Sequence, residues 1–169
     1  GAEFVRDIQP GEIVTISADG IESTFYTEDT KHHICAMEYI YFSRPDSDVE
    51  GINVHVSRKE CGKVLAKEAP CDADIVIGVP DSSLSAASGF AEQAGIPYEM
   101  GLIKNKYTGR TFIEPSQILR EKGVKMKLSP IRSVIEGKRV CMIDDSIVRG
   151  TTSKKIVAML RAMGAKEVH

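Results

Sequence analysis

The chain has 169 residues, of which 42% are hydrophobic and 27% are charged, a composition typical of a globular protein. Its 22 basic and 24 acidic residues give a formal net charge of −2, which argues against nucleic acid or a membrane surface as a partner. No run approaches the roughly 18 apolar residues of a membrane span, the N-terminus lacks a signal-peptide pattern, and the four cysteines form no C-x-x-C pair. We therefore expect a cytoplasmic protein with reduced thiols and no zinc site.

The first part of the chain predicts β-structure. Residues 12–26 contain two β-prone runs on either side of Asp19-Gly20, a dipeptide that favours tight turns, and so predict a hairpin. Residues 27–34 are polar and turn-like, which marks a domain boundary. Residues 35–42 are again β-prone and predict a strand.

A capping box then predicts the start of a helix. Ser57 takes the N-cap position and Glu60 follows three residues later, the spacing at which each side chain satisfies a free backbone amide. The helix that follows places Cys61, Val64 and Leu65 on one face.

The rest of the chain alternates strands and helices. Continuous apolar runs predict buried strands, and a glycine follows the last turn of each helix between them. The predicted strands are residues 73–80, 96–103 and 138–145, with a further one beginning near 166, and the predicted helices are residues 82–94 and 151–163. This order predicts an α/β fold, a mainly parallel twisted sheet with flanking helices.

The strongest candidate site follows the strand at 138–145. Asp144 and Asp145 end the strand, and a loop containing Gly150 then opens a helix with Thr151, Thr152 and Ser153. Carboxylates can accept hydrogen bonds from the vicinal hydroxyls of a sugar or hold a divalent cation, and the free amides of a helix start can hold a phosphate. The pattern indicates a ribose 5-phosphate site; the alternative is a capped helix after a strand with solvated acids.

Two further segments belong at the same edge of the sheet, because ligands bind at the carboxyl ends of parallel strands. Asp81, Ser82 and Ser83 start a helix after a strand, as an anion-binding loop or as a simple N-cap. Residues 104–110 hold Lys104, Lys106 and Arg110 around Tyr107 and Gly109, either as a basic lid over a polyanion or as a solvated turn.

Several strings in this order resemble the glutamine phosphoribosylpyrophosphate amidotransferase family, in its iron–sulfur-bearing bacterial branch. They are MEYIYFSRPDS, GVPDSS, GLIKNKYTGRTFIEPSQ, KLSPIRS and DDSIVRGTTS. The resemblance implies a type I phosphoribosyltransferase fold in residues 35–169, incomplete at the C-terminus. It implies that residues 1–34 are a β remnant of an N-terminal-nucleophile glutaminase domain.

The resemblance also implies a reaction, the first step of de novo purine biosynthesis. Ammonia from glutamine attacks C1 of phosphoribosyl pyrophosphate (PRPP), displaces pyrophosphate and gives 5-phosphoribosylamine. Asp144 and Asp145 would hold the ribose hydroxyls and Mg²⁺, with Ser82 as a further metal-site residue. The remaining implied roles are pyrophosphate binding by Asp81, Ser82 and Ser83, catalysis by Lys104, Tyr107 and Arg110, and phosphate binding by Ser146, Arg149, Gly150, Thr151, Thr152 and Ser153.

Other implied properties concern partners and cofactors. Family members form homotetramers, and purine nucleotides are expected inhibitors. Cys35 matches the first ligand of a [4Fe-4S] cluster in the full-length protein, or else is a buried thiol. The chain has no N-terminal cysteine nucleophile, so we expect it not to hydrolyse glutamine.

Three alternatives to this activity remain. The chain could be a PRPP-binding regulator of the same fold without catalysis, although such a protein could lose the basic segment at 104–110. It could be a phosphoribosyltransferase for a nucleobase, although no base-binding segment can be assigned. It could also retain the site as a fragment without turnover.

Overall fold

The computed structural model describes residues 3–105 and 128–169. The chain forms two compact units, Gly1–Cys35 and Ala36–His169, and each is described by itself. In the first unit, β1 (Glu12–Ser17) and β2 (Gly20–Phe25) form an antiparallel hairpin in which Ser17 pairs with Gly20. The hairpin predicted for residues 12–26 is confirmed, and its origin in a glutaminase domain stays a prediction.

The second unit is built on a parallel sheet. Its strands β5 (Ile75–Gly78), β8 (Arg139–Ile143) and β9 (Glu167–Val168) lie in the order β5-β8-β9. β5 pairs with β8 from Ile75↔Val140 to Gly78↔Ile143, so the carboxyl ends of the two strands meet. The α/β fold with a parallel sheet and flanking helices is therefore confirmed.

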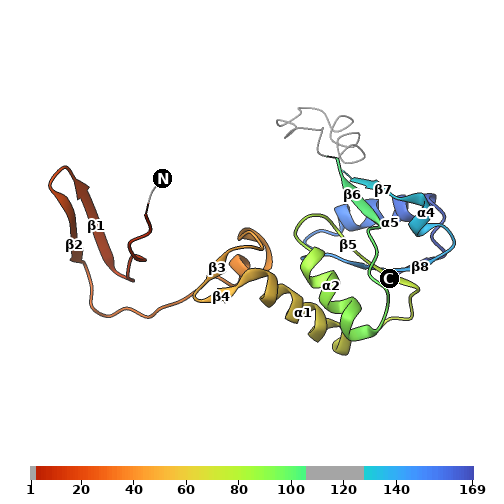
Figure 1. The fold of residues 1–169 in the computed structure, drawn as a ribbon, viewed down its shortest axis with the longest axis horizontal. Helices are drawn as coiled ribbons and strands as arrows, with labels where there is room; N and C mark the ends of the chain where they lie inside the picture. The colour runs from red at the N-terminus through yellow and green to blue at the C-terminus, as the bar shows by residue number, and fades with distance from the viewer. Residues whose placement is uncertain (1–2, 106–127) are drawn as a thin grey trace. The chain divides into compact units, whose positions relative to one another are not determined.

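Helices cover both faces of this sheet (Figure 1). They are α1 (Val54–Glu68), α2 (Leu84–Ala94), the short α4 (Arg132–Ile135) and α5 (Thr151–Ala162). Because side chains alternate along a strand, β5 directs Ile75 and Ile77 to a core shared with α5, and Val76 to a core shared with α2. None of the helices in the described ranges is long and apolar enough to cross a membrane.

Helices α1 and α2 lie against each other at two glycines. A Cβ atom on Gly62 would stand 1.9 Å from the Ala86 carbonyl oxygen, and one on Gly89 would stand 1.9 Å from that of Lys59. The two backbones can approach this closely only because both positions lack a side chain.

Short elements complete the second unit. They are the π-helix η1 (Glu38–Phe42) and the strands β3 (Asp48–Val49), β4 (Ile52–Asn53), β6 (Leu102–Lys104) and β7 (Leu128–Pro130). β3 pairs with β4 and β6 pairs with β7, both antiparallel. The strand predicted for residues 96–103 is thus divided: Tyr98 bridges to Val76 in the parallel sheet, whereas Leu102 begins β6.

The start of α1 differs from the prediction. The helix begins at Val54, and the Asn53 side chain accepts a hydrogen bond from the Val56 amide, so Asn53 and not Ser57 is the N-cap. The capping-box prediction is wrong because an asparagine one turn earlier already satisfies the free amides.

The buried face of α1 also differs from the face that the sequence indicated. The helix buries Val54, Arg58, Gly62 and Ala66, whereas Cys61, Val64 and Leu65 are exposed. Close packing of Gly62 on α2 decides the face, which hydrophobicity alone could not show.

The strand predicted for residues 35–42 is also wrong, because this segment is helical. The Ser43 amide donates to the Glu38 carbonyl, five residues back, and the Ser43 hydroxyl donates to the Glu38 carboxylate at 2.7 Å. Local contacts and a buried arginine, described below, stabilise the helical turn despite the β propensity of its residues.

Candidate functional site

The candidate site lies where β5 and β8 end. The Val79 amide donates to the Ile143 carbonyl at 3.0 Å, which holds the two strand ends together. The buried Ser83 hydroxyl then donates to Asp144 Oδ1 at 3.2 Å. Two segments that the sequence singled out, 61 residues apart, are thus in direct contact.

Asp144 is a partly buried carboxylate with an acidic neighbour. Its Oδ1 also accepts a hydrogen bond from the Asp145 amide at 2.9 Å. Burial raises the pKa of Asp144, and the charge of Asp145 adds to this effect, although the hydrogen bonds from the Asp145 amide and Ser83 oppose it. Such a carboxylate is stabilised by a nearby cation or by hydroxyl donors.

The loop after Asp145 leads into the N-terminus of α5. Ser146 donates to Asp145 Oδ1 at 2.7 Å, and Gly150 takes a left-handed conformation with φ +68° just before the helix begins at Thr151. The N-cap residue, Gly150, has no side chain to cap the first turn of α5, so the amides of this turn can bind a ligand.

A cavity of about 640 Å³ lies over this loop. It is lined by Asp144, Asp145, the loop through Ser153, and four residues from elsewhere, Met37, Tyr41, Phe42 and Val79. The lining of this cavity therefore combines two carboxylates with the hydroxyls and backbone amides at the start of α5. This arrangement can hold a polar diol and an anion together.

The loop after β5 carries the remaining described candidates. The Asp81 carboxylate pairs with Lys104 Nζ at 2.5 Å, and both side chains are more than half exposed. Ser82 and Ser83 line a second cavity of about 690 Å³, which reaches Asp144 and Asp145 from the side of α1. Ser83 occupies the N-cap position of α2, but its side chain makes no capping hydrogen bond there and donates instead to Asp144.

The donor set suits a hard cation whose coordination a ligand completes. Asp144, Asp145 and Ser82 offer only oxygen atoms, as Mg²⁺ prefers. Within the described ranges no three His, Cys, Asp or Glu side chains gather as a metal site. Mg²⁺ would therefore need oxygens from a bound phosphate and from water.

The described residues provide no cluster site around Cys35. Its thiol is exposed, so the buried-thiol alternative is wrong, whereas Cys141 is buried as expected. No group of three metal-ligating side chains in the described part of the chain includes it. Its role as an iron–sulfur ligand stays a prediction.

The structure adds residues that the sequence did not indicate. Tyr41 and Phe42, expected in a strand, line the cavity over residues 144–153, and their ring centroids lie 5.8 Å apart in an edge-to-face arrangement. In the sequence, only the adjacency of these two aromatic residues could have indicated that they line a site. Lys106, Tyr107, Gly109 and Arg110 lie outside the described residues.

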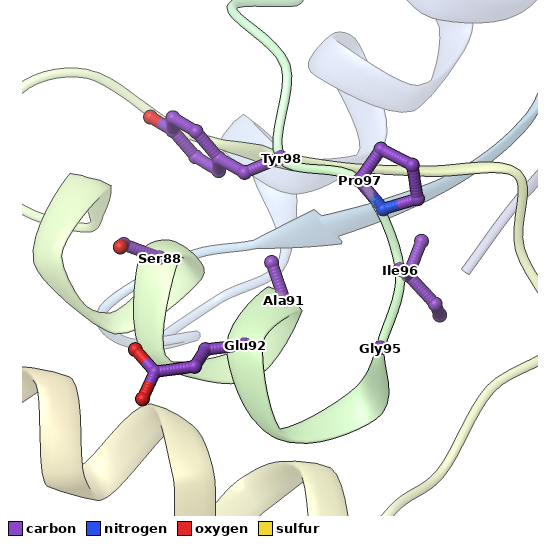
Figure 2. A pocket seen from close by; sticks show the side chains of 7 residues that line it. All are labelled: Ser88, Ala91, Glu92, Gly95, Ile96, Pro97 and Tyr98. Carbon is purple, nitrogen blue, oxygen red and sulfur yellow. The ribbon is translucent and has the colours of Figure 1, made fainter.

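A separate hollow of about 500 Å³ lies at the end of α2 (Figure 2). Glu92 is the one charged residue in its lining, and its carboxylate points toward α1, where it pairs with Lys59 and Lys63. Burial raises the pKa of Tyr98 there. This hollow lacks the converging polar groups of the site at the strand ends.

Comparison with known proteins gives a consistent result. The family model described as "Phosphoribosyl transferase domain" matches residues 61–169. The chain is 62% identical over all 169 residues to an amidophosphoribosyltransferase of Bacillus subtilis, and 59% identical to one of Staphylococcus epidermidis. It spans 36% and 34% of these relatives, about a third of their length.

Solved structures show the same likeness. A structure of "the allosteric regulatory enzyme of purine biosynthesis" and one of glutamine PRPP amidotransferase from B. subtilis complexed with ADP and GMP are each 62% identical to the chain. Each matches with a TM-score of 0.84, over 98% of this chain and 36% of that one.

Proposed function

We propose, given that the chain belongs to the phosphoribosyl transferase domain family, that its site binds PRPP with Mg²⁺ and serves an amidophosphoribosyltransferase. The reaction is the displacement of pyrophosphate from C1 of PRPP by glutamine-derived ammonia, which yields 5-phosphoribosylamine. The relatives over which the chain aligns in full carry the name of this activity. The chain would contribute the PRPP site.

One observation carries the proposal: the Ser83–Asp144 hydrogen bond joins the loop after β5 to the acidic end of β8. The contact puts Ser82 and Ser83 beside Asp144 and Asp145, which in turn lie beside the open amides of α5. A single ligand can therefore meet hydroxyls, carboxylates and amides in that order. PRPP offers pyrophosphate, ribose hydroxyls and 5-phosphate in the same order.

The roles of the residues follow from this placement. Residues 149–153, with their backbone amides and hydroxyls, would hold the 5-phosphate, with Ser146 beside them. Asp144 and Asp145 would accept hydrogen bonds from the ribose hydroxyls and stabilise positive charge that develops on the sugar as the bond to pyrophosphate breaks. Mg²⁺, when bound at Asp144, Asp145 and Ser82, would supply charge neutralisation for the pyrophosphate.

Lys104 would bind the departing pyrophosphate from the other side. Its ammonium lies next to the loop at residues 81–83, where it pairs with Asp81. Tyr107 and Arg110 would act with it. Positioning and charge stabilisation would supply most of the rate enhancement, because the protein forms no covalent intermediate in this scheme.

Further partners belong to the same proposal. The related structure complexed with ADP and GMP supports purine nucleotides as ligands, and their action as inhibitors stays a prediction. A homotetramer, and a [4Fe-4S] cluster that uses Cys35 together with ligands beyond this chain, stay predictions.

A titration of Mg²⁺ and PRPP into the purified chain tests the proposal by calorimetry. We expect Mg²⁺-dependent binding to the unaltered chain and none to the Asp144→Asn, Asp145→Asn variant, which keeps the shape of both side chains without their charge. If the unaltered chain is folded and does not bind PRPP, the proposed site is wrong for this chain.

Formation of 5-phosphoribosylamine from PRPP and ammonia is the next measurement. Turnover supports the transferase activity. Binding without turnover would favour a PRPP-binding protein that does not catalyse the reaction.

A further inference from the structure

Arg58 is a buried charged residue on α1 whose partners are unusual. Its side chain is 5% exposed, and it donates from Nε to the Tyr39 carbonyl at 2.5 Å and from Nη2 to the Ser43 carbonyl at 2.9 Å. No carboxylate within residues 3–105 and 128–169 forms an ion pair with it. A buried guanidinium is costly unless its donors are satisfied, so this position has a specific use.

Both carbonyls belong to one short segment. Residues 37–43, which we call the wall segment, contain η1, and the Ser43 amide closes the last turn by donating to the Glu38 carbonyl. Its residues face two ways: Met37, Tyr41 and Phe42 line the cavity over the phosphate loop, whereas Tyr39 and Ile40 line the cavity beside Ser82 and Ser83. The wall segment therefore stands between two cavities that meet at Asp144 and Asp145.

Few contacts hold the wall segment in place. The Tyr39 hydroxyl donates to the Val49 carbonyl at 2.8 Å, and the aromatic rings of Tyr41 and Phe42 are more than half exposed. Arg58 links the wall segment to α1, which is itself held against α2 by the close approach at Gly62 and Gly89. Its guanidinium thus joins the packed helix pair to the backbone of the wall segment.

We infer that Arg58 is a positioning residue for the phosphoribosyl site: it fixes the wall segment so that Phe42 and Tyr41 bound the cavity that receives the ribose 5-phosphate part of the substrate. The inference rests on the proposed function. Arg58 lines the cavity beside Ser82 and Ser83 and is not among the residues that line the cavity over residues 144–153. A wall segment that is held in place before ribose 5-phosphate arrives lowers the entropy cost of binding, so loss of Arg58 should weaken the binding of ribose 5-phosphate.

Calorimetric titration of ribose 5-phosphate tests the inference in the full chain. The variants are Arg58→Met, Arg58→Lys, Phe42→Ala and the double variant Arg58→Met, Phe42→Ala. Lys67→Met removes a positive charge from the exposed side of the same helix and serves as the control. Thermal unfolding identifies the temperature at which every variant is folded, and binding is compared there.

We expect Arg58→Met to weaken ribose 5-phosphate binding at least tenfold and Arg58→Lys to restore it to within about threefold, because an ammonium can still donate to the carbonyls. The double variant should bind no more weakly than the worse single variant, since Arg58 acts through the ring that Phe42→Ala removes. If Arg58→Met does not fold, Arg58→Gln replaces it in the same cycle.

The inference would be overturned if the losses of affinity for ribose 5-phosphate in the two single variants add up in the double variant, or if Arg58→Met binds as the unaltered chain does. It would also be overturned if Arg58→Lys binds ribose 5-phosphate as weakly as Arg58→Met. Titration of PRPP with Mg²⁺ into the unaltered chain separates the two claims. If the unaltered chain binds PRPP but the effects of the Arg58 and Phe42 variants are additive, only the role of Arg58 is wrong. If the unaltered chain does not bind PRPP, the proposed function is wrong as well.

Discussion

At the scale of one residue, Asp144 shows how a carboxylate placed in a candidate ligand site can lower the stability of the folded protein. Its carboxylate is partly buried beside Asp145, and burial raises its pKa. An acid whose pKa is higher in the folded state binds its proton more tightly there, so the stability it contributes falls as pH rises from the unfolded pKa through the raised folded pKa. At neutral pH the ionised carboxylate therefore destabilises the ligand-free protein.

Asp144→Asn should consequently stabilise the ligand-free chain while it removes Mg²⁺-dependent binding of PRPP. We expect a melting temperature higher by roughly a few degrees at neutral pH, with the difference disappearing in acid, where Asp144 is protonated. Thermal unfolding followed by circular dichroism across pH measures this. A lower melting temperature at neutral pH would show that hydrogen bonds from Ser83 and the Asp145 amide outweigh burial.

Gly150 takes a left-handed conformation in the loop that leads into α5. Its φ of +68° strains any residue with a Cβ atom, although no atom within 4 Å would block one. Gly150→Ala should therefore cost about 1 kcal/mol of stability and weaken ribose 5-phosphate binding, because the loop before α5 would shift.

Gly51 provides the matched control for this substitution. It has a φ of +74° and open space around it, but it lies in the turn between β3 and β4 and lines neither cavity at Asp144. Gly51→Ala should lower stability to a similar extent and leave binding unchanged. Equal effects of both variants on binding would mean that the conformation of Gly150 has no special role.

At the scale of elements, the close packing of α1 on α2 can be tested by a single substitution. Gly62→Ala adds a Cβ atom 1.9 Å from the Ala86 carbonyl oxygen, so α1 and α2 must separate. We expect a loss of about 1–3 kcal/mol or more in the free energy of unfolding, even though alanine is the better helix former. Urea denaturation measures the loss, and Gln93→Ala on the exposed side of α2 should change stability little. A stabilised Gly62→Ala variant would contradict the close packing.

Arg139 joins the beginnings of β5 and β8. Its guanidinium and amide donate to the Asp74 carboxylate, and this lowers the pKa of Asp74 to about 2. A lowered folded pKa contributes stability above the unfolded value of 3.8, and this contribution is lost as pH falls toward about 2.

Asp74→Asn should therefore lower the melting temperature at neutral pH, and the difference from the unaltered chain should shrink through that acidic window. Melting curves at a series of pH values test it. Asp46→Asn is a useful comparison, because Asp46 pairs with Arg44, two residues away on an exposed turn, and this pair joins no two elements. A difference for Asp74→Asn that is independent of pH would point to packing and not to charge.

The whole molecule divides between residues 35 and 36, and every described residue of the candidate site lies in the second unit. A chain of residues 36–169 should therefore fold and bind PRPP with Mg²⁺ as residues 1–169 do. Calorimetry on both chains measures this. Weaker binding by the shorter chain would show that the first unit contributes to the site.

The sequence predicted the strand ends that carry the candidate chemistry, because the signal there is local. The short apolar run at residues 140–143 is typical of a buried parallel strand, and the polar residues after it then lie at the edge of the sheet. Parallel strands then bring Asp144 beside Ser83, which the structure confirms at 3.2 Å.

Only the tertiary structure decided the elements whose local preference was weak. Residues 35–42 have β propensity, yet Glu38–Phe42 form a helical turn. Arg58, which is distant in the chain, stabilises this turn by donating to the carbonyls of Tyr39 and Ser43. Likewise α1 buries Gly62 and not Leu65, because a close backbone approach needs a glycine on each helix. Both outcomes depend on contacts between residues that are distant in the chain, and a local sequence pattern cannot predict such contacts.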